Sequence, residues 1–107
     1  MIINNLVNIH KAIRWMSSVL SMEIYRSGDG TFDLILLLSS NPIDNTKKMR
    51  VRFSEIKNLR LEKHIQLLYL SIKDISDRQW HRTRFEVTEL EDGAISFLCY
   101  EINIEDN

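Results

Sequence analysis

The 107-residue chain has few of the residues that break or cross-link a fold. It contains one proline, Pro42, three glycines and one cysteine, Cys99. Scarce proline and glycine argue against disorder, and a lone cysteine cannot form an internal disulfide. The longest apolar run, residues 34–38, is far shorter than the roughly 20 residues that a membrane-spanning helix needs. We therefore expect one soluble domain over residues 1–107, without a secretory signal, in the cytoplasm.

Charged residues make up 27% of the chain and are unevenly distributed, although the formal net charge is only −1. Residues 47–84 hold eleven basic and four acidic side chains, a net charge of +7. Residues 85–107 hold seven acidic side chains and no basic one, a net charge of −7. Either the two segments form surfaces of opposite charge that attract different partners, or neighbouring strands pair these charges across a sheet.

The N-terminal segment, residues 1–17, is predicted to form a helix. Leu6, Ile9 and Ile13 recur at the spacing of one helix face, and polar residues fall mostly on another. This pattern is typical of an amphipathic helix that packs against a core.

The remaining residues, 18–107, have the pattern of strands and turns. Apolar and polar side chains alternate over residues 49–54, as in a half-buried strand. A turn at residues 91–93 predicts a hairpin between residues 84–90 and 94–104, with an irregularity near Cys99. We therefore predict an α+β, mostly β fold, with the N-terminal helix packed on an antiparallel sheet of about six or seven strands.

Residues that could catalyse a reaction or hold a metal are scattered along the chain. The three histidines show no ligand spacing; they are His10, His64 and His81. Cys99 lies in an apolar strand, which favours a buried thiol over a nucleophile. No glycine-rich phosphate loop is present. We predict no catalytic residue, no metal and no cofactor; a small enzyme, the alternative, needs a pocket of convergent ionisable groups.

Trp80 stands in a polar stretch, residues 76–82, together with Arg78. Tryptophan and arginine are the residue types that most often anchor protein interfaces. The alternative is that Trp80 folds back over the edge of the core, because large aromatic side chains are usually buried.

The basic strands over residues 47–63 allow a second function. Lysine and arginine side chains there could contact phosphates, and nearby aromatic residues could stack on bases. The near-neutral pI of 6.3 and the absence of an RNA-binding signature favour a protein partner instead. A nucleic-acid-binding or adaptor domain is the alternative; we expect no direct contact with nucleic acid or membrane.

Several segments in the second half carry a family resemblance. Residues 49–61 contain a strand, a Phe-Ser turn and a Leu-x-Leu pattern, and residues 72–79 read Ile-x-Asp-Ile-Ser-x-Arg-Gln. Residues 85–87 and 95–99 follow in the same order. Over residues 49–104 the chain resembles the immunity protein 50 family of bacterial polymorphic toxin systems, which include contact-dependent growth inhibition. The resemblance implies a protein that binds and blocks a cognate toxin, often a nuclease.

A nuclease needs a basic cleft to attract phosphate, so an inhibitor that fills its active site benefits from an acidic surface. We therefore predict two candidate toxin-binding surfaces. The first consists of the acidic residues of the C-terminal hairpin and its continuation: Glu86, Glu89, Glu91, Asp92, Glu101 and Glu105. The competing surface contains Trp80 and Arg78.

Overall fold

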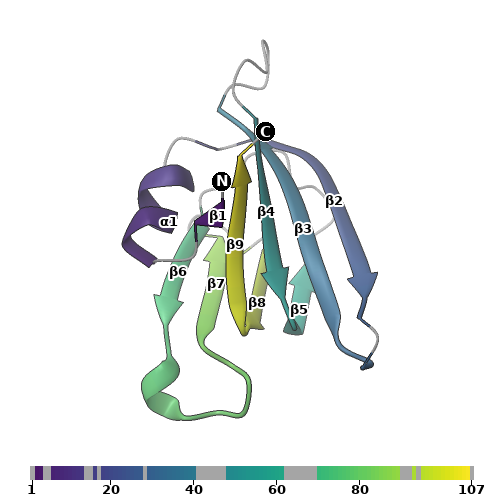
Figure 1. Ribbon diagram of the computed structural model, residues 1–107, viewed down its shortest axis with the longest axis vertical. Helices are drawn as coiled ribbons and strands as arrows, with labels where there is room; N and C mark the ends of the chain where they lie inside the picture. The colour runs from purple at the N-terminus through teal and green to yellow at the C-terminus, as the bar shows by residue number, and fades with distance from the viewer. Residues whose placement is uncertain are drawn as a thin grey trace.

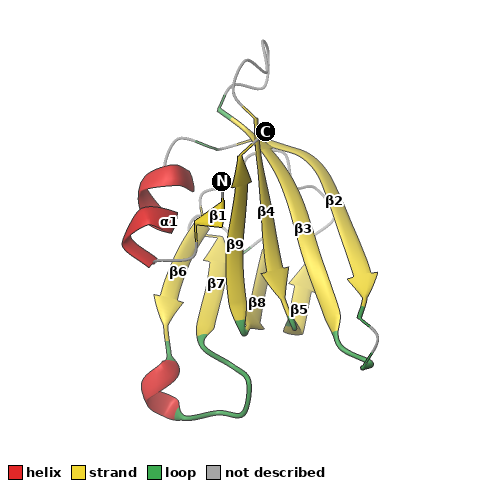
Figure 2. Cartoon of the chain, in the orientation of Figure 1, coloured by secondary structure: helices red, strands yellow, loops and turns green. Residues whose placement is uncertain are grey.

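The computed structural model describes residues 2–3, 6–13, 16, 18–27, 29–40, 48–61, 70–89, 93 and 95–106. These residues contain one α-helix, one 3-10 turn and nine strands (Figures 1 and 2). In chain order they are β1 (Ile2–Ile3), α1 (Leu6–Ile13), β2 (Ser18–Arg26), β3 (Phe32–Ser39), β4 (Lys48–Ser54), β5 (Lys57–Leu61), β6 (Leu70–Asp74), the 3-10 turn η1 (Ser76–Arg78), β7 (Phe85–Glu89), β8 (Ile95–Cys99) and β9 (Glu101–Asp106).

The strands form two antiparallel sheets that pack face to face. Sheet A has the order β1-β9-β4-β3-β2, and sheet B has the order β5-β8-β7-β6. Figure 1 shows the two layers, with β5 and β8 behind β4 and β9. The predicted fold class, mostly β with an N-terminal helix, is confirmed. The strands, however, are divided between two sheets instead of lying in one.

Two strand pairs turn a corner from one sheet into the other. The β4–β5 segment bends at Glu55, whose φ is 53°. The long strand predicted over residues 94–104 breaks at Tyr100, one residue after the expected irregularity. The Tyr100 amide donates a hydrogen bond to the Ser54 carbonyl oxygen at 2.9 Å, which joins the two corners. Both bends therefore occur at the same end of the two layers.

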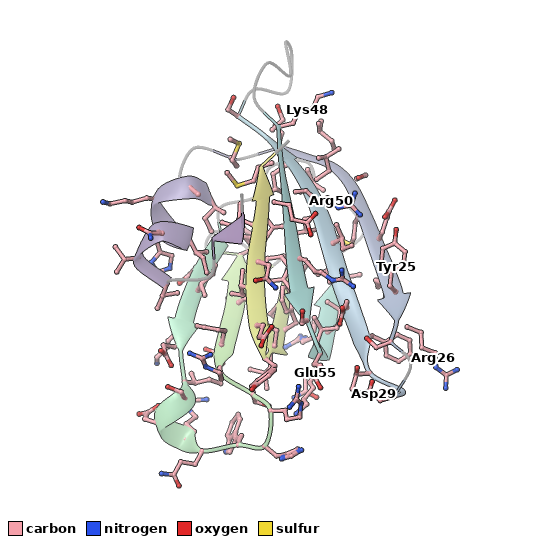
Figure 3. All side chains as sticks on the ribbon, viewed as in Figure 1. Tyr25, Arg26, Asp29, Lys48, Arg50 and Glu55 are labelled. Atoms are coloured by element: carbon pink, nitrogen blue, oxygen red, sulfur yellow. The ribbon has the colours of Figure 1, made fainter. Side chains whose placement is uncertain are left out.

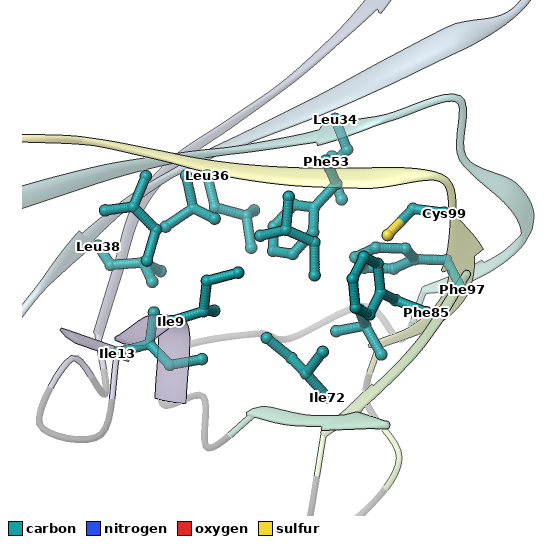
Figure 4. Packing of buried hydrophobic residues seen from close by; sticks show 14 of the residues in the cluster. Ile9, Ile13, Leu34, Leu36, Leu38, Phe53, Ile72, Phe85, Phe97 and Cys99 are labelled. Carbon is teal, nitrogen blue, oxygen red and sulfur yellow. The ribbon is translucent and has the colours of Figure 1, made fainter. Parts of the chain in front are cut away.

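The core lies between the sheets, and alternation along three of the strands supplies much of it. β4 buries every second residue, and so do β7 and β8. Phe53 of sheet A and Phe97 of sheet B meet edge to face, with ring centroids 4.9 Å apart (Figure 4). Ile9 and Ile13 of α1 complete the cluster. Burial of these apolar faces is the main stabilising contribution to the fold.

Helix α1 packs beside β6 and closes one side of the two layers (Figure 1). The His10 Nε2 atom lies 3.0 Å from the carbonyl oxygen of Ile72, so the imidazole can donate a hydrogen bond to β6. Of the predicted helical segment, residues 1–17, Leu6–Ile13 form the helix, whereas the prediction is wrong for Ile2–Ile3, which pair with β9 as strand β1. Among the described residues, no helix has the length and apolar character needed to cross a membrane.

Replacing Phe53 with alanine should lower the free energy of unfolding by about 3–5 kcal/mol, because the change removes a fully buried ring and leaves a cavity. Urea denaturation followed by circular dichroism measures this loss. Phe32→Ala is the matched control, since the Phe32 side chain is about half exposed; its loss should stay below about 1 kcal/mol. Equal losses for the two variants would contradict this assignment of the core.

Candidate protein-binding site

The segment between β6 and β7, residues 75–84, carries Arg78 and Trp80. It starts at Asp74, whose Oδ1 atom accepts hydrogen bonds from the Ser76 hydroxyl at 2.6 Å and the Ser76 amide at 2.8 Å. These two bonds lower the pKa of the Asp74 carboxyl, the hydroxyl contributing most. The carboxylate thus holds the first turn of η1 in place.

An ion pair ties this segment to the sheet corner. The guanidinium of Arg82 donates to both carboxylate oxygens of Glu55, with N–O distances of 2.6 to 2.9 Å. The same guanidinium stacks over the Tyr100 ring, 4.2 Å from its centroid. Hydrogen bonding to Glu55 raises the pKa of Arg82. Bidentate geometry fixes both the distance and the orientation of the two side chains, so we call this contact the Glu55–Arg82 clamp.

Lys57 adds a second attachment. Its Nζ atom donates to the His81 carbonyl oxygen at 2.7 Å and to the Thr83 hydroxyl oxygen at 2.9 Å. The Thr83 hydroxyl in turn donates to the same carbonyl at 3.0 Å. Thr83 is buried, so this network anchors the end of the segment to the edge of sheet B.

Backbone strain is concentrated around this segment. Within the described part of the chain, the non-glycine residues with positive φ are Glu55, Asn58, Gln79 and Arg82. Two of them form the clamp, Asn58 lies in the neighbouring strand β5, and Gln79 separates Arg78 from Trp80. Non-glycine residues adopt this conformation at an energetic cost and persist where the surroundings enforce it, often at functional sites.

Trp80 and Arg78 line a groove of about 460 Å³ on the outer face of sheet B. The Trp80 side chain is 50% exposed, and the Arg78 guanidinium lies 5.1 Å from its ring centroid. The alternative prediction, that Trp80 caps the core edge, is therefore wrong. The groove is lined by Asn58, Arg60, Arg78, Trp80, Glu86, Thr88, Ser96, Phe97 and Leu98.

The predicted acidic residues do not share one face. Glu86 lines the groove beside Trp80 and Arg78. Glu89 is only 4% exposed because alternation along β7 turns it to the inner face, so it does not belong to an exposed acidic surface. Glu101 and Glu105 lie on β9 in the other sheet. Glu91 and Asp92 lie outside the described residues.

The basic residues of β4 are largely neutralised within sheet A. Arg52 contacts Asp33 with N–O distances of 3.0 and 3.1 Å, and the buried Asp33 carboxylate also accepts the Glu55 amide. Arg50, labelled in Figure 3, lies directly opposite Glu105 on β9, and their closest N–O distance is 3.8 Å. Cross-strand pairing thus accounts for part of the uneven charge distribution, and strand β4 does not present a free basic stripe for phosphates.

Asn58, Arg60 and Glu55 are among the site residues that sequence reasoning missed. The sequence placed Asn58 and Arg60 in a basic strand but did not indicate which face of the sheet their side chains occupy. It gave Glu55 no role. An asparagine inside a strand-like stretch, as at Asn58, is a weak sequence signal for a β-bulge. No sequence signal indicates that Glu55 and Arg82, 27 positions apart, form an ion pair.

The described residues offer little reactive chemistry. They contain no group of three or more His, Cys, Asp or Glu side chains that could hold a metal ion. Cys99 is buried in the core, and burial raises the pKa of its thiol far above the ordinary value. The site therefore consists of an aromatic anchor, two guanidiniums and a polar floor, which suits recognition of another molecule.

Comparison of the whole chain with known protein families identifies it as an immunity protein. The matching family is Immunity protein PIM8, whose model covers residues 1–105, and the chain belongs to this family. No curated protein and no solved structure matches it. Immunity proteins of this family are not enzymes, and membership implies a cognate toxin as the partner.

Cys99 should be unreactive in the folded protein. Because burial raises the thiol pKa, the thiolate stays scarce even at about pH 9, above the usual pKa of a free cysteine. Ellman's reagent should report almost no free thiol under native conditions and one thiol per chain in urea. Rapid labelling of the native protein would contradict the burial of Cys99.

The Glu55–Arg82 clamp should protect residues 75–84 from proteolysis. Glu55→Gln removes the charge that holds Arg82, so trypsin should cleave after Arg78 several-fold faster under native conditions, as mass spectrometry of the fragments can show. Glu105→Gln is the control because it removes an exposed ion pair in sheet A. An unchanged cleavage rate in Glu55→Gln would show that the clamp does not order the segment.

Proposed function

We propose that this immunity protein neutralises its cognate toxin by direct, stoichiometric binding through the groove under Trp80. One observation carries the proposal: a half-exposed tryptophan lines a polar groove from a segment that is tied to the corner between the sheets by Glu55 and to β5 by Lys57. Tyr25 and Phe32 are exposed to a similar extent, but only Trp80 lines this groove together with an arginine, the pair of residue types that most often anchors protein interfaces. Trp80 is the residue that we expect to be buried in the complex.

The fixed position of Trp80 favours tight binding. A free loop loses conformational entropy when it is ordered at an interface, and this cost reduces the affinity. Here the Glu55–Arg82 clamp and the hydrogen bonds of Lys57 order the segment before the partner arrives. Tryptophan and arginine anchors in such settings commonly contribute most of the binding energy.

We further propose that the toxin is a nuclease and that the protein occludes its active site, in the cytoplasm of the producing cell and its kin. Support comes from sheet A, where Glu101 is exposed on β9 beside the bend at Tyr100 and Glu105 lies farther along the same strand, opposite Arg50. Acidic side chains there suit a basic phosphate-binding cleft. As part of the same proposal, the protein acts in a contact-dependent growth inhibition system and is related to the immunity protein 50 family.

The alternative function, direct binding of nucleic acid by residues 47–63, receives less support. Arg50 and Arg52 face carboxylates, and Lys57 donates its hydrogen bonds to residues 81 and 83. Of the other described basic side chains in this stretch, Arg60 lines the groove and Lys48 is exposed at the start of β4. One guanidinium beside Glu86 makes a poor phosphate-binding track.

Trp80→Ala should weaken binding of the cognate toxin by about 30-fold or more, because a central tryptophan anchor commonly contributes about 2 kcal/mol or more. The toxin domain is obtained by co-expression with the neighbouring reading frame and co-purification. Isothermal titration calorimetry then gives the dissociation constant and stoichiometry, and growth of toxin-expressing cells gives protection.

Two variants serve as comparisons for this experiment. Tyr25→Ala removes an aromatic ring of similar exposure from sheet A and should leave toxin binding unchanged. The double variant Glu101→Lys/Glu105→Lys tests the acidic surface and should slow association mainly at low salt. Full affinity in Trp80→Ala, with loss in the acidic variant, would move the interface from sheet B to sheet A.

A further inference from the structure

The floor of the Trp80 groove consists of outward-facing side chains of sheet B in two cross-strand rows. The first row is Arg60, Ser96 and Thr88, and the second is Leu98 and Glu86; Lys57 continues the second row outside the lining residues. Ser96 and Thr88 are small and carry hydroxyl groups that both donate and accept hydrogen bonds. The floor is therefore low and polar along the first row, so that the main chain of another protein can approach it.

A bulge in β5 decides which side chain reaches the groove. Lys57 lies opposite Leu98 and Arg60 lies opposite Ser96, so β5 holds one extra residue between these pairs. The left-handed conformation of Asn58, with φ of 54°, accommodates the extra residue. Without the bulge, Leu59 would face the groove and Arg60 the core. With it, Leu59 packs against the core and Arg60 lines the groove.

The charge of the groove selects its occupant. Arg60 on β5 and Arg78 on η1 line it, and Glu86 is the carboxylate among the described lining residues. The two guanidiniums outnumber this one carboxylate. Two guanidiniums with their planar donor sets are suited to a carboxylate, which each can bind through two parallel hydrogen bonds. Trp80 and Leu98 add an apolar surface beside them.

We propose that the groove binds an extended acidic segment of the cognate toxin, an inference that rests on the proposed function. An Asp or Glu side chain of the segment binds Arg60 and Arg78. A neighbouring apolar side chain packs between Trp80 and Leu98. The main chain of the segment runs over Ser96 and Thr88. This surface is thus opposite in charge to the acidic surface predicted from sequence, and it contacts a different part of the toxin.

A nucleic acid is also anionic, but the groove suits it less. Glu86 lies inside the groove and repels phosphate groups, which occur at every nucleotide, whereas a peptide can place one carboxylate away from Glu86. The row of small hydroxyl side chains also matches a peptide main chain, which has donors and acceptors in alternation. Binding of an oligonucleotide in place of a peptide is an outcome of the experiments below.

The first experiment reverses the charge of the groove. Arg60→Glu/Arg78→Glu should weaken binding of the toxin domain encoded by the neighbouring reading frame by about 30-fold or more, because like charges then face each other in the interface. The control is Lys11→Glu/Arg26→Glu, which changes the net charge equally at exposed positions of α1 and β2 (Arg26 is labelled in Figure 3). Calorimetry at two salt concentrations gives the affinity, and circular dichroism verifies folding.

A steric variant tests the groove without changing charge. Ser96→Trp places a large ring on the floor and should abolish toxin binding. Ser71→Trp is the matched control, because Ser71 continues the same cross-strand row beyond the lining residues. Unchanged affinity in the charge-reversal and Ser96→Trp variants, together with loss in Trp80→Ala, would overturn this inference and leave the proposed function intact.

A toxin-independent measurement separates the two claims when the neighbouring gene product fails to bind. Panning a random 12-residue peptide library against the wild-type protein, with Trp80→Ala protein as the subtraction step, should select peptides with an acidic residue beside an apolar one. Basic consensus sequences would overturn the inference, and so would Trp80-dependent binding of a single-stranded oligonucleotide. Acidic peptides without toxin binding would retain the groove chemistry and refute the proposed function.

Discussion

The corner at Glu55 is the constraint on which both the fold and the site depend. At this residue the chain leaves sheet A with a positive φ and enters sheet B. The Ser54 carbonyl beside it accepts the Tyr100 amide, and the Ile56 amide donates to the Phe32 carbonyl oxygen at 2.8 Å. These bonds satisfy backbone groups that the bend removes from the ladders. The same bend directs the Glu55 carboxylate to Arg82. The geometry that connects the two sheets therefore also orders residues 75–84, the segment that carries Trp80.

Local sequence patterns predicted the elements but not how they are divided between the sheets. Alternation over residues 49–54 and in the hairpin of residues 84–104 reflects burial of one face of each strand. This burial is visible in the residues of each strand alone. The corner at Glu55 leaves no such record, because glutamate has no preference for positive φ. A continuous sheet and a folded one have the same alternation, and so the sequence could not distinguish them.

The candidate site was predicted only in part, because local patterns do not record how the strands are arranged in the two sheets. Trp80, Arg78 and Glu86 were predicted as site residues, the first two because of their residue types in a polar stretch, and the structure brings all three to one groove. Arg60 could not be placed, because its direction depends on a one-residue bulge. The inward direction of Glu89 was recoverable from the alternation that placed Phe85 and Val87 in the core. The acidic surface was predicted from the net charge of a segment, and net charge does not indicate which face of a strand each side chain occupies.

Apart from Phe97, the groove and the core use different residues in this protein, and the two faces of sheet B explain how. In β7 and β8 the inward side chains form the core, whereas Thr88, Ser96 and Leu98 stand between them in sequence and face the groove. Glu55, Arg82 and Thr83, which hold the Trp80 segment in place, are not among the lining residues. Changes on the groove floor therefore alter the surface offered to a partner while the core and the clamp keep their contacts. Because small substitutions at exposed strand positions cost little stability, the shape and charge of the groove can change on a constant scaffold, as the proposed role in toxin binding requires.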